Sequence, residues 1–129
     1  MVRYNYTRSV EPPAPFVHVT LRSPGPDKIV SDVPALLDCA ADRSVIPARF
    51  VEQLGLVQID EVSIMGFGGH VVMAPSFLVE IALRQLPAVT VESIADADEP
   101  YVILGRDVLN SFRVLLDGPN LVVEIQSPS

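Results

Sequence analysis

Twelve prolines are distributed along this chain of 129 residues. Proline has no backbone N–H and interrupts both helix interiors and sheet interiors, so closely spaced prolines leave room only for short regular elements. Hydrophobic residues make up 49% of the chain, aromatic residues only 6%, and there is no tryptophan. The sequence therefore predicts a mostly β fold around an aliphatic core, with one or two short helices.

The length and charge of the chain narrow the class of protein. A chain of this length forms one domain. Its net charge of −7 argues against nucleic acid or an anionic membrane surface as the main partner. No apolar run approaches the roughly 18 residues of a membrane span, the first six residues lack a signal-peptide core, and a single cysteine cannot form an intrachain disulfide. We expect a soluble, cytoplasmic protein.

The pattern along the chain predicts one folded unit with two terminal extensions. We expect residues 1–15 to form an extended Pro-rich arm without a role in the core, residues 16–126 to form the domain, and residues 127–129 to form a tail. Alternating or continuous apolar runs predict strands at 16–21, 28–37, 57–65, 70–72, 76–83, 88–94 and 101–104, and a strand pair over 114–125. Met73-Ala74-Pro75 is expected to interrupt the strand that starts at His70. Helical spacing predicts short helices over 47–55, ending at Gly55, and over 106–112.

The stretch from Val33 to Pro47 is the candidate functional site. An apolar run ends at one acid, Asp38, which is followed by the small residues Cys39, Ala40 and Ala41. Placing a carboxylate at the end of a buried strand costs free energy unless its charge takes part in the chemistry of a site or is paired. This pattern indicates an active-site carboxylate, although a single acid at a strand end is more commonly a turn or cap residue.

A second feature is the glycine-rich segment between two predicted strands, formed by Gly66, Phe67, Gly68 and Gly69. Glycines at this position predict a hairpin with a mobile tip, or simply a hairpin turn. The segment lacks the Gly-Lys-Ser/Thr ending and the following helix of a phosphate-binding loop. The two histidines, His18 and His70, have no supporting ligands nearby in the sequence, so we expect no metal site.

Three segments resemble, in the same order, those of the retropepsin-like aspartic proteases. The active-site loop of that family reads apolar-apolar-Asp-Thr/Ser-Gly-Ala, and residues 36–41 match it with Cys39 in place of Thr or Ser and Ala40 in place of Gly. The family's glycine-rich flap is matched by 66–69, and its apolar-apolar-Gly-Arg-Asp segment by 102–109. The closing strand pair is also similar, so the resemblance covers residues 16–126.

The resemblance implies a closed β-barrel with a flap hairpin and the activity of an aspartic endopeptidase without metal or cofactor. Asp38 would be the catalytic residue, and a homodimer would supply the second aspartate. Asp42 and Arg106 would pair as a structural brace of the loop, unless they are ordinary surface charges. The apolar residues that match the substrate pocket of the family are Leu36, Val45 and Ile103. All three are aliphatic, so peptide or protein substrates with apolar side chains beside the scissile bond are expected.

Cys39 and Ala40 favour an alternative reading. A thiol is a weaker hydrogen-bonding group than a hydroxyl, and Ala40 adds a methyl group where the family brings substrate backbone close. The chain would then be a catalytically impaired or inactive relative that serves as a peptide-binding or dimerisation module. Two further interpretations are a Cys39–His70 hydrolase, which lacks an orienting third residue, and a small β-barrel binding protein if the resemblance is accidental.

Overall fold

In a computed structural model, described for residues 1–25, 28–66 and 68–128, the chain is mostly β, as predicted. The described part contains ten strands and two short helices. Their order is β1 (Val2–Asn5), β2 (Phe16–Arg22), β3 (Ile29–Leu37), β4 (Val45–Pro47), α1 (Arg49–Leu54), β5 (Gln58–Met65), β6 (Val71–Ala82), β7 (Val89–Asp96), β8 (Val102–Leu104), α2 (Arg106–Leu109), β9 (Arg113–Asp117) and β10 (Val122–Gln126).

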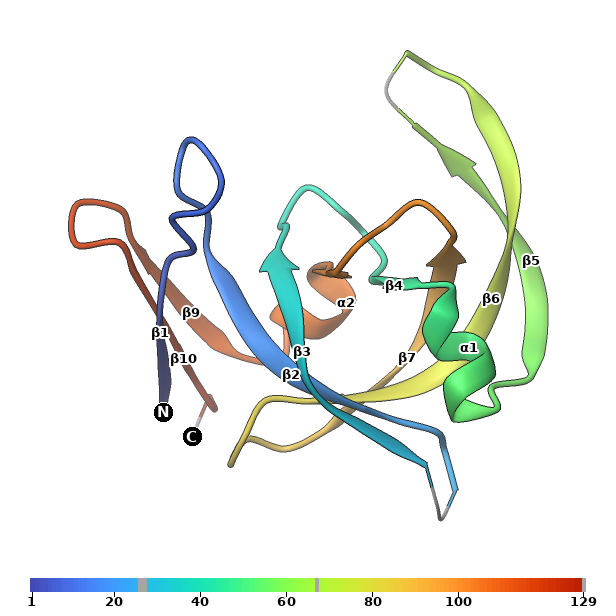
Figure 1. The fold of residues 1–129 in the computed structure, drawn as a ribbon, viewed down its shortest axis with the longest axis horizontal. Helices are drawn as coiled ribbons and strands as arrows, with labels where there is room; N and C mark the ends of the chain where they lie inside the picture. The colour runs from blue at the N-terminus through green and yellow to red at the C-terminus, as the bar shows by residue number, and fades with distance from the viewer. Residues whose placement is uncertain (26–27, 67, 129) are drawn as a thin grey trace.

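The larger of two sheets closes on itself. Its strand order is β2-β3-β8-β4-β7-β6-β5, and an additional pairing joins β2 to β6. This pairing closes six strands into a ring, and β5 is attached outside the ring through β6 (Figure 1). The alternation predicted for the first strand explains its packing, because Val17, Val19 and Leu21 are buried while His18 is exposed. The closed β-barrel expected from the sequence is confirmed.

The smaller sheet has the order β1-β10-β9, and it gives the N-terminal segment a role that we did not expect. Strand β1 pairs antiparallel with β10, and Val2 is 3% exposed and belongs to the hydrophobic core. Tyr4 and Tyr6 pack against the same core. The prediction that residues 1–15 have no role in the core was therefore wrong. As a strand paired with β10, this segment turns alternate side chains, those of Val2, Tyr4 and Tyr6, toward the core.

The two helices are shorter than the sequence predicted. Pro47 belongs to β4, and α1 begins at Arg49. Gly55 ends α1 with a left-handed backbone (φ 63°), and its N–H bonds to the carbonyl oxygens of Glu52 and Val51, as a C-terminal glycine cap does. The second helix, α2, ends at Leu109 rather than at residue 112.

Strand β6 runs through Pro75, where the sequence predicted an interruption. Pro75 is paired with Glu61 of β5, and the pairing of β6 with β7 begins only at Ser76. The missing N–H of proline is tolerated at such a position because one side of the strand needs no ladder bond there. The result is a long β5–β6 hairpin that extends beyond the barrel (Figure 1).

Among the described residues, no helix has the length and hydrophobicity needed to cross a membrane.

Candidate active site

Asp38 is the first residue after β3, and the backbone of the adjoining barrel strand fixes its position. Its N–H donates to the carbonyl oxygen of Leu104 at 3.0 Å, which continues the parallel pairing of β3 with β8. Its carboxylate oxygen Oδ1 accepts a bond from the N–H of Ala40 at 3.0 Å, and its carbonyl oxygen accepts from the N–H of Ala41. The side chain is half-buried. The loop thus forms a tight turn that holds one carboxylate at the end of a buried strand.

A buried hydrogen-bond network joins the far end of this loop to the start of α2. Ser44 is fully buried, and its hydroxyl donates to Oδ1 of Asp107 at 2.6 Å and accepts from the N–H of Gly105 at 3.0 Å. The N–H of Ser44 donates to Oδ2 of the same carboxylate at 2.9 Å. Each buried polar atom of this network has a partner, which is the condition under which such a network rigidifies a site.

Gly105 allows the two backbones to touch. A side-chain carbon at this position would lie 2.7 Å from the carbonyl carbon of Arg43 and 3.0 Å from the carbonyl oxygen of Ala41. Both neighbours are backbone atoms, so they cannot move aside as the end of a side chain could. The glycine in the apolar-apolar-Gly-Arg-Asp segment is therefore explained by close approach to the Asp38 loop.

Arg106 braces the loop by a different route from the one predicted. Its guanidinium Nη1 donates to the carbonyl oxygens of Cys39 at 2.9 Å and Ala40 at 3.2 Å, and its backbone N–H donates to Ala41. The predicted ion pair with Asp42 is not formed among the described residues, where Asp42 is exposed. Both carbonyl oxygens lie within hydrogen-bonding distance of one guanidinium nitrogen, so Arg106 holds the loop without a carboxylate partner.

The three predicted pocket residues lie in one row across the barrel. Leu36 of β3 is paired with Ile103 of β8, and Ile103 is paired with Val45 of β4. All three are half-buried, which leaves apolar surface exposed next to Asp38 in the sheet. Residues that are directly paired on neighbouring strands point to the same face, so the row forms a continuous aliphatic surface.

Two hollows lie between the barrel and the β5–β6 hairpin, and they share Ile64 and Ile94. One has a volume of about 330 Å³ and is mostly apolar, with Val45 the predicted pocket residue in its wall. The other, of about 360 Å³, is lined by Asp42 and Arg43 of the loop and by the hairpin residues Ser63, Ile64, Met65 and Val71, besides Ile94. Together they form a cleft between the Asp38 loop and the hairpin.

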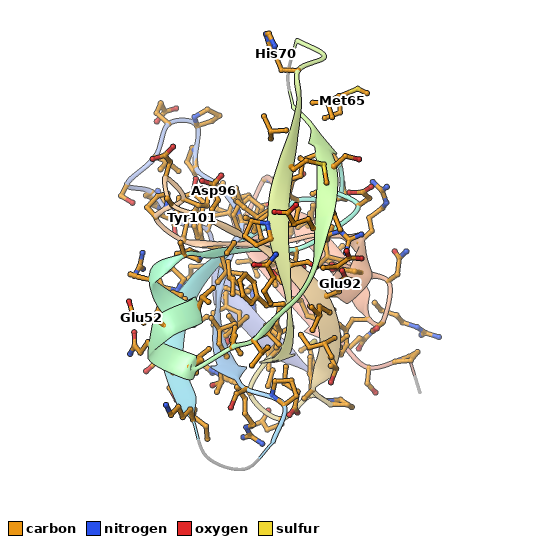
Figure 2. All side chains as sticks on the ribbon, turned by 90° about the vertical axis from the view of Figure 1, so that its right-hand side faces the viewer. Glu52, Met65, His70, Glu92, Asp96 and Tyr101 are labelled. Atoms are coloured by element: carbon orange, nitrogen blue, oxygen red, sulfur yellow. The ribbon has the colours of Figure 1, made fainter. Side chains whose placement is uncertain are left out.

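The predicted flap glycines Gly66, Gly68 and Gly69 are at the tip of this hairpin, and Phe67 lies outside the described residues. The N–H of Gly66 bonds to the carbonyl oxygen of His70, and that of Gly69 bonds to Gly66. His70 and Met65 stand at the outer end of the hairpin, away from Asp96, Tyr101 and Glu92 on the body (Figure 2). Met65 is 73% exposed. The hairpin end therefore presents apolar side chains with little packed against them.

The described residues contain no group of three or more His, Cys, Asp or Glu side chains that could hold a metal ion. Near the apolar hollow, burial raises the pKa of Glu99 above its usual value, and the negative charge of Asp96 raises it further. Asp96 itself lines that hollow, so the acidic loop borders the cleft.

Comparison of the sequence with known proteins identifies the family of the chain. A sequence model described as "Aspartyl protease" matches residues 19–108, well over half of the chain. The chain belongs to this family.

Two viral polyproteins are similar in sequence to this member of the aspartyl protease family. The chain is 28% identical over 122 residues to the Gag-Pro and Gag-Pro-Pol polyproteins of human T-cell leukemia virus 3 (strain Pyl43), and the match covers 88% of this chain. It spans only 20% and 8% of these two polyproteins.

Two solved structures are similar to it. The EIAV protease in complex with the inhibitor HBY-793 has 27% identity and a TM-score of 0.55, with 75% of this chain and 86% of that chain covered. A retropepsin-like aspartic protease from Rickettsia conorii has 10% identity and a TM-score of 0.63, with 96% and 88% covered. The retropepsin-like fold is therefore shared, as the sequence resemblance implied.

Sequence reasoning missed three polar residues of this aspartyl protease family site. Ser44 and Asp107 are 63 positions apart, and nothing local in either segment indicates that they meet. Arg43 was also missed; its Nη1 donates to the carbonyl oxygen of Glu92 at 3.1 Å and lies 3.6 Å from the carboxylate of Glu92. The one available signal was that Ser44 and Asp107 belong to the two segments that carried the resemblance.

Proposed function

We propose that the protein is an aspartic endopeptidase that cleaves peptide bonds flanked by apolar residues, with Asp38 as its catalytic residue. The observation that carries the proposal is a carboxylate anchored at the end of β3, in a chain of the aspartyl protease family, beside a row of half-buried aliphatic side chains. The row of Leu36, Ile103 and Val45 supports apolar side chains on either side of the scissile bond.

The chemistry requires two carboxylates about 3 Å apart that share one proton, because two like charges at that distance cannot both ionise. One carboxylate removes a proton from a water molecule, and the protonated partner polarises the scissile carbonyl. A homodimer with Asp38 contributed by each subunit on a two-fold axis provides this pair. The β5–β6 hairpin is the proposed flap, which covers an extended peptide and excludes water.

The second candidate function is a catalytically impaired relative that binds peptides or dimerises. The observation that favours it is the presence of Cys39 and Ala40 beside Asp38, both exposed. Cys39 lacks the hydroxyl that could bond across the dimer axis. Against it, Ala40 is not among the residues with positive φ, so alanine introduces no backbone strain at this position.

The test is peptide cleavage by three forms of the chain. The natural protein, Asp38→Asn and the double variant Cys39→Thr/Ala40→Gly are incubated with a mixed peptide library from acidic to neutral pH, and products are identified by mass spectrometry. We expect the natural chain to cut between apolar residues and Asp38→Asn to show no cleavage while keeping its thermal unfolding midpoint. Cleavage by the double variant alone would instead support the impaired relative. Cleavage retained in Asp38→Asn would reject the aspartic mechanism.

A further inference from the structure

Strand β5 is an open edge of the larger sheet. It stands last in the order β2-β3-β8-β4-β7-β6-β5, so among the described strands it pairs with β6 alone, and it is the outermost strand at the right of Figure 1. Its sequence contains no lysine, arginine or proline. Natural edge strands commonly carry such residues, because they discourage pairing with another chain. The backbone of β5 is therefore available as a template for one more strand.

An apolar hollow adjoins the N-terminal end of this edge. It has a volume of about 220 Å³, and its walls include Pro24 after β2, Leu56 between α1 and β5, Ile59 of β5 and Leu78 of β6. Ile59 is 48% exposed and Leu78 is 41% exposed. Pockets for small-molecule ligands usually measure about 300–1,000 Å³. The hollow is smaller than these pockets, so its size suits an aliphatic side chain of a partner better than a cofactor.

A β-bulge places Ile59 in the wall of the hollow. The register of β5 with β6 shifts between Gln58 and Asp60, so Ile59 has no residue opposite it on β6. A bulge of this kind bends the strand and re-aims a side chain. Asp60 is paired with Ser76, and Leu78 lies two residues farther along β6, so Asp60 and Leu78 are on the same face of the sheet. The carboxylate of Asp60 is therefore next to the hollow.

Two carboxylates thus follow the hollow along β5. Asp60 and Glu61 are exposed, and neither forms an ion pair among the residues that the structure describes. The Oδ1 atom of Asp60 accepts the N–H of Glu61 at 2.8 Å, which orients this carboxylate and leaves it further acceptor capacity. Lys28 reaches the hollow at Gly55 but pairs with neither carboxylate. A lysine or arginine of a partner would supply the missing positive charge.

The chemistry of this edge selects among possible partners. A second copy of β5 fits poorly, because β5 has no basic residue and self-pairing leaves its acids without a cation in any register. An anionic lipid surface would be repelled by the same carboxylates and by the net charge of −7. An extended basic segment suits both the open backbone and the charges. In recognition by strand addition, backbone hydrogen bonds give affinity and side-chain pockets give specificity.

We propose that the β5 edge and the adjoining hollow bind an extended basic segment of a partner protein. The segment adds a strand beside β5, inserts an aliphatic side chain into the hollow and sets lysine or arginine beside Asp60 and Glu61. The site is separate from the cleft at Asp38, because among the described residues the hollow shares no lining residue with the two hollows of the cleft. The inference goes beyond the proposed function and does not require cleavage.

The test is the binding of labelled peptides, followed by fluorescence anisotropy on the Asp38→Asn chain so that no probe is cleaved. The probe has eight residues, as β5 does, with valine and threonine alternating in one half and lysine and threonine in the other. It is made in both chain directions, and a comparison peptide carries glutamate in place of lysine. One direction of the lysine probe should bind at least about tenfold more tightly than its glutamate counterpart. Equal binding of the two, or binding of neither, overturns the proposal.

A matched pair of charge reversals locates the bound probe. Glu61→Lys should raise the dissociation constant of the lysine probe at least about fivefold, because it sets like charges together. Asp98→Lys makes the same change in net charge at an exposed position on the loop beside the cleft, and should alter the constant by less than about twofold. Equal losses in the two variants would indicate non-specific attraction to an acidic protein and would overturn the site.

A second pair tests the hollow. Ile59→Ser should weaken binding of the lysine probe about three- to tenfold, because it removes apolar surface from the wall. Leu115→Ser is its control, since Leu115 is 54% exposed on the strand β9 at the edge of the other sheet. Unfolding midpoints verify that all variants fold. A loss in Leu115→Ser without one in Ile59→Ser overturns the site, and so does self-association of the free chain that Ile59→Ser abolishes, because the occupant would then be a second copy.

Discussion

The Asp38 loop and the end of the β5–β6 hairpin line the same cleft, yet the chain holds them very differently. The loop is tied to α2 by the buried Ser44–Asp107 network and by backbone contact at Gly105. The hairpin end has its own ladder bonds and exposed apolar side chains. Internal hydrogen bonds are concentrated at the Asp38 loop, where a carboxylate must keep one position. Exposed apolar surface is concentrated at the hairpin end, where a ligand would supply the missing contacts.

The largest effect is expected at the glycine where the loop touches α2. Gly105→Ala sets a methyl group 2.7 Å from the carbonyl carbon of Arg43, and such overpacking should lower the free energy of unfolding by about 3 kcal/mol. Gly66→Ala is the matched control on the hairpin, because a side-chain carbon there meets no atom within 4 Å. Urea denaturation of both variants is the measurement. Equal stability of the two would show that the loop can yield and that the contrast is wrong.

A smaller loss is expected from the buried hydroxyl. Ser44→Ala leaves the N–H of Gly105 without its acceptor and removes a donor from Asp107, which should cost about 2 kcal/mol. Ser63→Ala on the hairpin, where the serine is exposed, should change stability by less than about 0.5 kcal/mol. Thermal unfolding followed by circular dichroism distinguishes the two. A Ser44 variant as stable as the Ser63 variant would contradict a rigid loop.

Substitutions at the end of the hairpin should weaken peptide binding and leave stability unchanged. Met65→Ser combined with Val71→Ser removes exposed apolar surface from the cleft, so the unfolding midpoint should hold while KM for an apolar peptide rises about three- to tenfold. Val57→Ser is the control, because Val57 is 76% exposed but lines a different hollow. Steady-state kinetics on one peptide gives the comparison. An equal rise in KM for the control would remove the hairpin from the binding site.

The smallest effect concerns the acidic loop at the rim of the cleft. Burial first, and the charge of Asp96 second, raise the pKa of Glu99 above its unfolded value of 4.5, so its ionised form destabilises the folded state. Glu99→Gln should therefore be slightly more stable than the natural chain at neutral pH. This advantage should shrink as the pH falls through the raised pKa and vanish below the unfolded one. Chemical denaturation between pH 7 and about pH 4 checks the sign; a variant less stable at neutral pH contradicts it.

The fold was largely predictable because its signals are local. Alternation identified β2, and Gly55 marked the end of α1. The sequence could not show that Pro75 lies outside the β6–β7 pairing, since that depends on register. Val2 was overlooked because its alternating neighbours are followed by a Pro-rich stretch, and its burial depends on β10 at the other end of the chain.

The candidate site was predictable in part for the same reason. Asp38 and the row of Leu36, Val45 and Ile103 lie in segments with recognisable local patterns, and the structure brings the row together. The predicted partner of Arg106 was wrong, because a guanidinium donates to backbone carbonyl oxygens as well as to carboxylates, and only three-dimensional placement decides between these acceptors. The Ser44–Asp107 contact arises from the docking of two distant segments.

The pairing of β1 with β10 has a consequence for how the molecule can be attached to something else. It holds the two ends of the chain close together, on the side of the body away from the hairpin tip (Figure 1). A tether fused to either end would therefore leave from the same side of the body, away from the hairpin tip. Immobilised on a bead by a tag at either terminus, the protein should offer its cleft to peptides in solution equally well in both orientations.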